Sequence, residues 1–362
     1  MEVLKKVKLK SLRLGASFFD SLREDYGKNS FEKWFNKKAS ANFEAYVKFD
    51  NFLNIKAFLM LQIKNEIEED IVPFQSNKKR IKISTLKIDD SNRLQRLSES
   101  VINIIFAEMG KNNIDEAYIT LFKEKQPLLY NILSSWGFIV TGTKGAEIVM
   151  TKFSYKTMDT VKKNYKWYFK EPISNLYENS NFYLIPLEAV YHDKLLPNNK
   201  LLNVENQSKE FDTSSISISK TYISKISYYK LPKNGDFLLE YRMSDIAPKT
   251  FNSVVTGVGI VNEVHDGNKM QFDAWLKLVG KTLVFTLEEL KDQFNRGRKI
   301  VIKFFHILSF GEGNNVTHNW LRENEIWPEN FYLPAYAIKN RELIYKLILE
   351  RLKNNENLDV NT

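Results

Sequence analysis

The run from Arg80 to Phe138 constrains the fold most, because strand-like and helix-like patterns alternate along it without interruption. Residues 81–88 alternate apolar and polar side chains, as a half-buried strand does, and the apolar helix after them is expected to end near Met109. A second strand is predicted at 116–122, and a second helix closes on Phe138. Strands that alternate with helices in this way predict an α/β unit built on a mixed sheet.

The segments on either side of this run extend the same unit. They are a basic strand at Val7–Leu14, an amphipathic helix at Phe18–Trp34, a strand pair at Phe43–Phe49 and Asn54–Lys64, and a hairpin at Ile139–Thr141 and Ala146–Lys152. We therefore expect one α/β domain over residues 1–153.

The pattern changes after this domain. Residues 154–180 form a basic, aromatic connector, and from 181 to 353 short strands are separated by turns, which is typical of a small β-barrel or sandwich. A charged helix at Asn340–Leu352 and a flexible tail at 354–362 are expected to end the chain. The predicted strands of this second domain are Ile216–Ile223, Phe237–Arg242, Val254–Val264, Thr282–Phe285 and Ile300–His306.

Composition excludes several classes of site. A chain of 362 residues suggests two domains, and the absence of cysteine excludes disulfides, thiolate catalysis and cysteine-based zinc sites. It also fits a reducing, cytoplasmic environment. The four histidines are scattered without ligand spacing, so no metal site is expected. No apolar run is long enough for a membrane span, and the formal charge of +9 favours a polyanionic partner.

The order strand, turn, helix, strand, helix and Gly137-Phe138 resembles the GNAT N-acetyltransferase superfamily over Val7 to Lys152. In that family the first strand pairs with the pantetheine arm of acetyl-CoA, and a glycine-rich turn offers helix N-terminal amides to the pyrophosphate. The resemblance implies acetyl-CoA as cofactor. It also implies a set of cofactor-binding residues: Leu86, Lys87, Ile88, Arg93, Arg96, Leu97, Ser98, Glu99 and Gln126.

The turn departs from the family pattern. Arg96 stands where the first glycine belongs and Ser98 at the second small position, so the Arg96 guanidinium either pairs with phosphate or fills the pocket. Leu133 occupies the position at which the family commonly has a general-acid tyrosine. Tyr130, one turn earlier, and Glu44, on an early strand, are candidates for catalysis, and Tyr46 or Tyr118 could also serve a substrate amine.

The second domain resembles the PUA-like superfamily, which includes ASCH and EVE domains, over Phe182 to Ile338. The resemblance lies in the segment Thr221–Lys225, in the Gly235-Asp236 turn that begins a strand, and in the glycine-rich strand Val255–Val261. It implies a cleft for RNA or a modified base, read by stacking and hydrogen bonds. The candidate contacts are Lys225, Tyr241, Arg242 and Ser244, together with Lys166 and Trp167 of the connector.

The pairing of these modules resembles bacterial fusion proteins in which the second domain presents a nucleic acid to the first. It implies an acetyl-CoA-dependent N-acetyltransferase that acts on, or is guided by, nucleic acid, with RNA or tRNA favoured over DNA and a toxin- or defence-like role. The alternative is a catalytically inactive GNAT-fold protein that binds nucleic acid or a modified base. A second copy of the chain or an antitoxin are further candidate partners.

Overall fold

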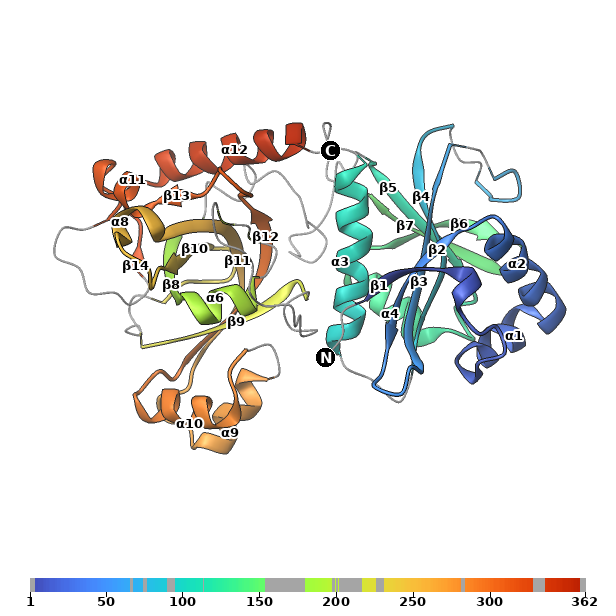
Figure 1. Cartoon of the computed structure of the whole chain (residues 1–362), viewed down its shortest axis with the longest axis horizontal. Coiled ribbons are helices and arrows are strands. Elements are labelled where there is room, and N and C mark those ends of the chain that lie inside the picture. Colours follow the sequence, from blue (N-terminus) through green and yellow to red (C-terminus); the bar gives the residue numbers. More distant parts are fainter. Residues whose placement is uncertain are drawn as a thin grey trace. The chain divides into compact units, whose positions relative to one another are not determined.

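A computed structural model describes residues 4–65, 68–73, 77–89, 95–112, 114–153, 180–196, 199, 201, 217–225, 231–280, 284–327 and 336–358. The chain divides into two compact units, Met1–Tyr168 and Phe169–Thr362, and each contains its own sheet (Figure 1). Within the described ranges, the search for a helix with the length and apolarity of a bilayer span found none.

The first unit is built on a mixed, seven-stranded sheet. Its neighbouring strands are antiparallel, except for the parallel pair β4 and β5. The strand order is β1 (Lys5–Lys8), β2 (Glu44–Phe49), β3 (Ile55–Lys64), β4 (Arg80–Ile88), β5 (Glu116–Leu121), β7 (Glu147–Phe153) and β6 (Ile139–Lys144). This is the mixed sheet with helices that the sequence predicted.

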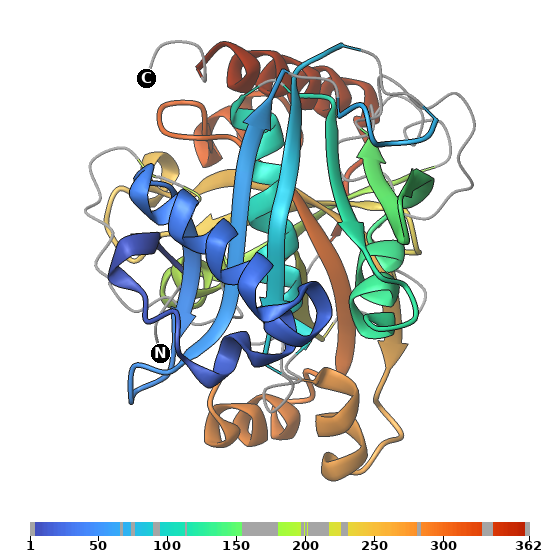
Figure 2. The ribbon, with the colours of Figure 1, turned by 90° about the vertical axis from the view of Figure 1, so that its right-hand side faces the viewer.

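Helices cover both faces of this sheet, with α1 and α2 on one face and α3 on the other (Figure 2). Buried aromatic rings fix the first layer, because Phe19 packs edge-on against Phe35 and Phe58. The helical elements are η1 (Leu9–Ser11), η2 (Ser17–Phe19), α1 (Asp20–Tyr26), α2 (Lys28–Ser40), α3 (Gln95–Lys111) and α4 (Pro127–Ser135).

Two predicted elements of the first unit are shorter than expected. The single helix predicted at Phe18–Trp34 is divided at Gly27, whose φ of 80° ends α1 and begins α2. The strand predicted at Val7–Leu14 ends at Lys8, and the chain continues as η1. Positive φ is a backbone property that apolar periodicity does not report, which is why the break was not predicted.

The second unit contains a mixed sheet that curls into a half-barrel, as the predicted small barrel requires. Strands β8 and β10 are parallel, and the other pairs are antiparallel. The order is β14 (Tyr336–Ala337), β8 (Phe182–Glu188), β10 (Phe237–Met243), β11 (Val254–Asp266), β12 (Ile300–Ser309) and β9 (Ser219–Ser224), and β13 (Val316–Thr317) pairs with β11.

Six helices accompany this sheet in the described ranges. They are α6 (Ala189–Leu195), α8 (Lys249–Asn252), α9 (Phe272–Val279), α10 (Leu287–Asn295), α11 (His318–Glu323) and α12 (Arg341–Leu358). Helix α9 was not predicted; its fully buried Trp275 donates a hydrogen bond to the carbonyl oxygen of Lys299.

Two predictions for the second unit need correction. The strand predicted at Thr282–Phe285 begins outside the described residues, and 284–286 is not a strand but leads to the N-cap of α10, Thr286. The terminal helix continues to Leu358, six residues beyond its predicted end and into the segment predicted as a tail.

Candidate functional sites

Strands β4 and β5 part soon after they meet. They pair in register only at Ile81 with Ala117 and at Lys82 with Tyr118, although β4 continues to Ile88. An extra residue in β4, Ser84, bulges opposite β3 two residues after the last pair with β5, at Lys82. Beyond this point the side of β4 that faces β5 has no β5 partner for its backbone hydrogen bonds.

A cavity of about 520 Å³ lies where these strands part. Residues from β4, the first turns of α3, helix α1 and the start of α4 line it. Five residues that the sequence predicted for the cofactor are among them: Leu86, Lys87, Ile88, Ser98 and Gln126. The lining carries both signs of charge, since Lys87 and Lys125 lie with Glu24 and Asp25.

Two buried polar atoms near this opening lack a hydrogen-bond partner in the described structure. They are Oε1 of Gln126 and Oγ of Ser84. The other end of the Gln126 amide donates to a carboxylate oxygen of Asp25 at 2.9 Å, which fixes the orientation of the side chain. A buried acceptor without a donor is costly in free energy, and so Oε1 of Gln126, a residue that lines the cavity, fits a site that a polar ligand completes.

The remaining predicted residues of the first unit are not gathered in this cavity. Leu97 and Glu99 belong to α3 and are buried, whereas Arg93 lies outside the described residues. The backbone of Arg96 is in the first turn of α3, but its side chain is also outside the described set.

The two candidates for catalysis do not line the cavity either. The ring of Tyr130 lies 4.9 Å from the ammonium of Lys123, and Glu44 lies 3.8 Å from the ammonium of Lys6. Leu133, at the position of the family's tyrosine, is fully buried. The side chains of Glu44, Tyr130 and Leu133 therefore do not supply a proton donor or acceptor to the cavity.

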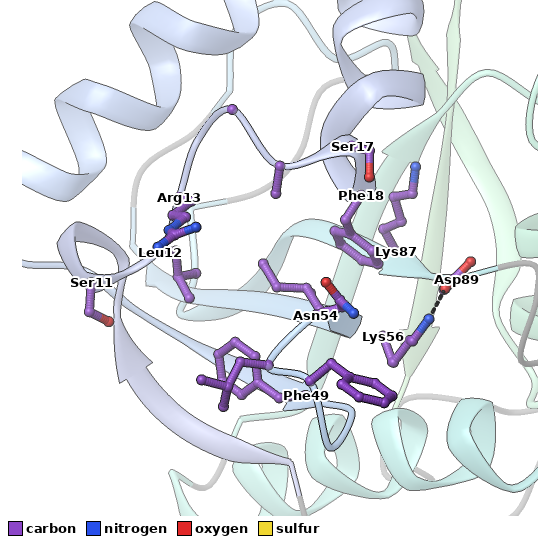
Figure 3. A pocket seen from close by; sticks show the side chains of 15 residues that line it. Ser11, Leu12, Arg13, Ser17, Phe18, Phe49, Asn54, Lys56, Lys87 and Asp89 are labelled. Carbon is purple, nitrogen blue, oxygen red and sulfur yellow. Dashed lines mark hydrogen bonds and ion pairs between the residues drawn. The ribbon is translucent and has the colours of Figure 1, made fainter.

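A second and larger cavity, of about 1160 Å³, reaches β4 at Lys87 (Figure 3). It lies between the loop that holds η1 and η2 and the turn between β2 and β3. Figure 3 shows the ion pair between Lys56 and Asp89, 2.8 Å apart, at its edge. Lys87 lines both cavities, so this lysine marks the point at which they are adjacent.

Sequence reasoning missed a cluster of charged groups around Glu68. Its carboxylate accepts hydrogen bonds from Tyr118 at 2.7 Å, from Lys144 at 2.9 Å and from Lys82. Burial raises the pKa of Glu68, but the three donors outweigh burial and bring the pKa to about 2. Glu68 is thus an ionised structural partner and not a free base, and its position in a loop gave no sequence signal.

In the second unit, the predicted nucleic-acid contact Arg242 is engaged inside the protein. Its guanidinium makes two hydrogen bonds to Asp193, at 2.8 and 2.9 Å, and the residue is 5% exposed. Burial raises the pKa of Asp193, yet the hydrogen bonds from Arg242 and His192 bring it to about 2. The predicted role of Arg242 as an exposed phosphate or base contact therefore does not fit this geometry.

The other predicted contacts are not gathered around Arg242. Tyr241 is buried, with its hydroxyl 3.0 Å from Nδ1 of His318, and Ser244 is buried and bonded to Ser253. Lys225 is exposed, but it follows β9 at the end of β11 opposite to Arg242. The expectation that Lys225 lies near Arg242 is wrong, because it depended on strand register. Lys166 and Trp167 lie outside the described residues.

Scans against models of protein families and against curated proteins found no match. A number of solved structures match the chain in part, and three of them are typical. They are Naa20 of Chaetomium thermophilum in complex with a bisubstrate analogue (12% identity, 45% of this chain, 93% of that chain, TM-score 0.32), an ASCH protein of Zymomonas mobilis (13%, 47%, 95%, 0.30) and the PaiA N-acetyltransferase of Thermoplasma acidophilum in complex with coenzyme A (16%, 37%, 76%, 0.26).

Each match covers less than half of the chain, and every TM-score lies below 0.5. These matches therefore carry no argument of their own, and the fold is described by its element order: parallel strands that part beside a helix N-terminus in the first unit, and a curled mixed sheet in the second. These are the folds that the resemblances to the GNAT and PUA-like superfamilies implied.

Proposed function

We propose that the first unit binds acetyl-CoA in the cavity between β4, α1, α3 and α4 and acts as an N-acetyltransferase. The observation that carries this proposal is the parting of β4 from β5 at Lys82, with a cavity of about 520 Å³ at the opening. When bound, the cofactor would supply an activated acetyl group. The protein residues would bind and orient it.

Each part of the cavity has a distinct contribution in this proposal. The segment of β4 from Leu86 to Ile88, which lies beyond the register pairs with β5 and lines the cavity, can hydrogen-bond an extended arm that carries amide groups. The first turn of α3 presents backbone amides and the positive end of the helix dipole to a pyrophosphate, next to Ser98. The orphaned oxygen of Gln126 accepts a hydrogen bond from the ligand.

Titration calorimetry with acetyl-CoA on the full chain tests the proposal. The informative variant is Ser98→Asp, because a carboxylate in the first turn favours the helix while it repels a pyrophosphate. We expect wild type to bind and Ser98→Asp to bind at least about tenfold more weakly. Ser30→Asp is the matched control: Ser30 is exposed in the first turn of α2, does not line the cavity and should leave affinity unchanged.

Absence of binding by folded wild type at millimolar acetyl-CoA would exclude the proposal. Equal weakening of binding by Ser98→Asp and Ser30→Asp would show that the cofactor does not bind at the first turn of α3. The role of Arg96 is separated by two further variants. If its guanidinium pairs with phosphate, Arg96→Ala weakens binding. If its bulk fills the pocket, Arg96→Gly strengthens binding.

A second candidate function, nucleic-acid binding, is favoured by the net charge of +9. Gel-shift titrations with RNA and DNA oligonucleotides at several salt concentrations would test it, since phosphate contacts make affinity fall as salt rises. Lys225→Ala is the cleaner probe, because Lys225 is exposed, whereas Arg242→Ala would leave Asp193 without its partner. Salt-independent or absent binding to both polymers would contradict this function.

A further inference from the structure

Three neighbouring strands of the second unit bring Glu240, Gly257 and Ser309 into one row. Glu240 of β10 is in register with Gly257 of β11, and Gly257 is in register with Ser309 of β12. The register of β12 slips at Ile307, so that His306 pairs with Gly259 and Leu308 with Val258. This bulge brings the side chains of His306 and Ser309 to the same side of the sheet, although three residues separate them.

Within this row, a carboxylate, an imidazole and a hydroxyl are hydrogen-bonded in series. Nδ1 of His306 lies 2.8 and 3.0 Å from the two carboxylate oxygens of Glu240. Nε2 of the same ring lies 2.9 Å from Oγ of Ser309. A nucleophile bonded to a base, which is itself oriented by a carboxylate, is the arrangement that activates serine for attack on a carbonyl carbon.

Gly257 makes this arrangement possible. A Cβ atom at position 257 would lie 2.5 Å from a carboxylate oxygen of Glu240, 2.5 Å from the carbonyl oxygen of Leu308 and 3.0 Å from the amide nitrogen of Asn199. These distances are far shorter than van der Waals contact. Only glycine at this position of β11 leaves room for the polar side chains of Glu240 and Asn199. The glycine has an ordinary φ, so its role here is close approach and not backbone freedom.

Further polar groups hold the carboxylate and the hydroxyl in place. Nδ2 of Asn199 lies 3.3 Å from Oε2 of Glu240 and 2.9 Å from Oγ1 of Thr256, which orients the amide. Its Oδ1 consequently accepts the single hydroxyl hydrogen of Ser309 in this structure, and the hydroxyl turns that hydrogen to the adjacent Nε2 of His306 for the reaction. Thr256 is bonded in turn to the fully buried His192 at 2.7 Å.

Exposure is graded along the series. The Glu240 side chain is fully buried, the His306 side chain is 21% exposed and Ser309 is partly exposed. The hydroxyl end of the series is therefore the end that solvent and a substrate can reach. A nucleophile must be reachable, whereas the carboxylate that orients its base is more effective when water is excluded.

We propose that Ser309, His306 and Glu240 form a second active site, which hydrolyses an acyl compound, and that this activity is separate from the function proposed for the first unit. Ser309 Oγ attacks the acyl carbonyl carbon while Nε2 of His306 takes the hydroxyl proton. Glu240 holds the other ring nitrogen as a donor and stabilises the imidazolium. The bond from the carbonyl carbon to the leaving oxygen, sulfur or nitrogen breaks, and the leaving group takes the proton from His306.

Water completes the reaction. It attacks the acyl-serine ester, gives a proton to His306 and releases a carboxylic acid, after which the imidazole returns the proton to Oγ of Ser309. The substrate class is thus an ester, thioester or amide whose carbonyl group reaches Ser309. The co-reactant is water.

An alkyl fluorophosphonate, which phosphonylates activated serines, tests the nucleophile in the full chain. We expect one adduct on wild type, located at Ser309 by peptide mass spectrometry. The position of the adduct is informative without any variant, because an ordinary serine does not react with a fluorophosphonate. No adduct on folded wild type, or an adduct at another residue only, would overturn the proposal.

Hydrolysis of 4-nitrophenyl acetate tests the base and the carboxylate. We expect Ser309→Ala to lower kcat/KM at least about 100-fold, and Glu240→Gln, which keeps the volume but not the charge, to lower it to a similar extent. Ser219→Ala is the matched control, because Ser219 is partly exposed on β9, which pairs with β12 opposite Phe305. Each variant is compared by thermal melting, and equal rates in folded Ser309→Ala and Ser219→Ala would overturn the assignment.

Discussion

At the scale of single residues, Lys152 on β7 is a lysine whose side chain is buried in the first unit. It is 2% exposed, and its ammonium lies 5.3 Å from the ring of Phe106 on α3. Burial lowers the pKa of Lys152 to about 7. Between this value and the ordinary pKa near 10.5, the unfolded chain binds more protons than the folded one, so stability should rise with pH across this window.

We predict that Lys152→Met increases the stability of the first unit at pH 7 and removes this rise, which is at most about 1.4 kcal/mol per pH unit. Urea unfolding at pH 7 and pH 9, followed by tryptophan fluorescence, measures both effects. Lys37→Met, at an exposed position on α2, is the control and should keep the slope of wild type. A variant at position 152 that loses stability at both pH values would contradict the prediction.

A second prediction at this scale concerns the ion pair between Arg242 and Asp193. Asp193→Asn should destabilise the second unit by about 2 kcal/mol, because it leaves a guanidinium that is 6% exposed without its counter-charge. The value is below that of a fully buried pair, since Asp193 is 34% exposed. Asp292→Asn breaks an exposed pair with Arg296 and should change stability by no more than about 0.5 kcal/mol. Equal effects in urea unfolding would refute the distinction.

The sequence could predict only those residues of the candidate site whose positions depend on the local order of strands and helices. Leu86, Ser98 and Gln126 were found because each occupies a fixed place relative to one strand or helix. The bulge at Ser84 and the burial of Arg242 depend on how strands pair, and the register between two strands cannot be predicted from either segment alone.

At the scale of elements, strand β11 depends on its glycines. We predict that Gly257→Ala destabilises the second unit by about 2–4 kcal/mol, because the added Cβ meets the backbone oxygen of Leu308, which cannot move away without disturbing the pairing with β12. Gly15→Ala is the control, as nothing lies within 4 Å of its added Cβ. Thermal melting of both variants checks this, and unchanged melting of Gly257→Ala would show that the neighbours relax.

Most strands were predicted from their alternation, since burial on one face imposes a period of two. The elements that were missed or misjudged have other causes. Helix α9 is only eight residues long and follows a turn, and α1 and α2 appear continuous in periodicity although Gly27 divides them. The short strands β13 and β14 are set by their partners, β11 and β8, and carry no periodic signal of their own.

At the scale of the whole molecule, each unit has its own buried core, with one cluster around Phe19 and Phe58 and another around Leu238 and Phe304. We predict that fragments 1–168 and 169–362, expressed separately, fold on their own. Circular dichroism and cooperative thermal melting of each fragment measure this. Acetyl-CoA binding should remain with the first fragment and fluorophosphonate labelling with the second. A fragment that melts without cooperativity would show that its core requires the other unit.

The brief pairing of β4 with β5 has a mechanical consequence. The sheet of the first unit consists of four strands, β1 to β4, and three strands, β5 to β7. Two residue pairs join these parts, together with α3, the ion pair of Arg80 with Glu116, and the carboxylate of Glu68. Register pairing between the two parts ends at Lys82, whereas β4 remains paired with β3 as far as Ile88. A ligand that contacts both parts beyond Lys82 would therefore stiffen the unit where the ladder between them is absent.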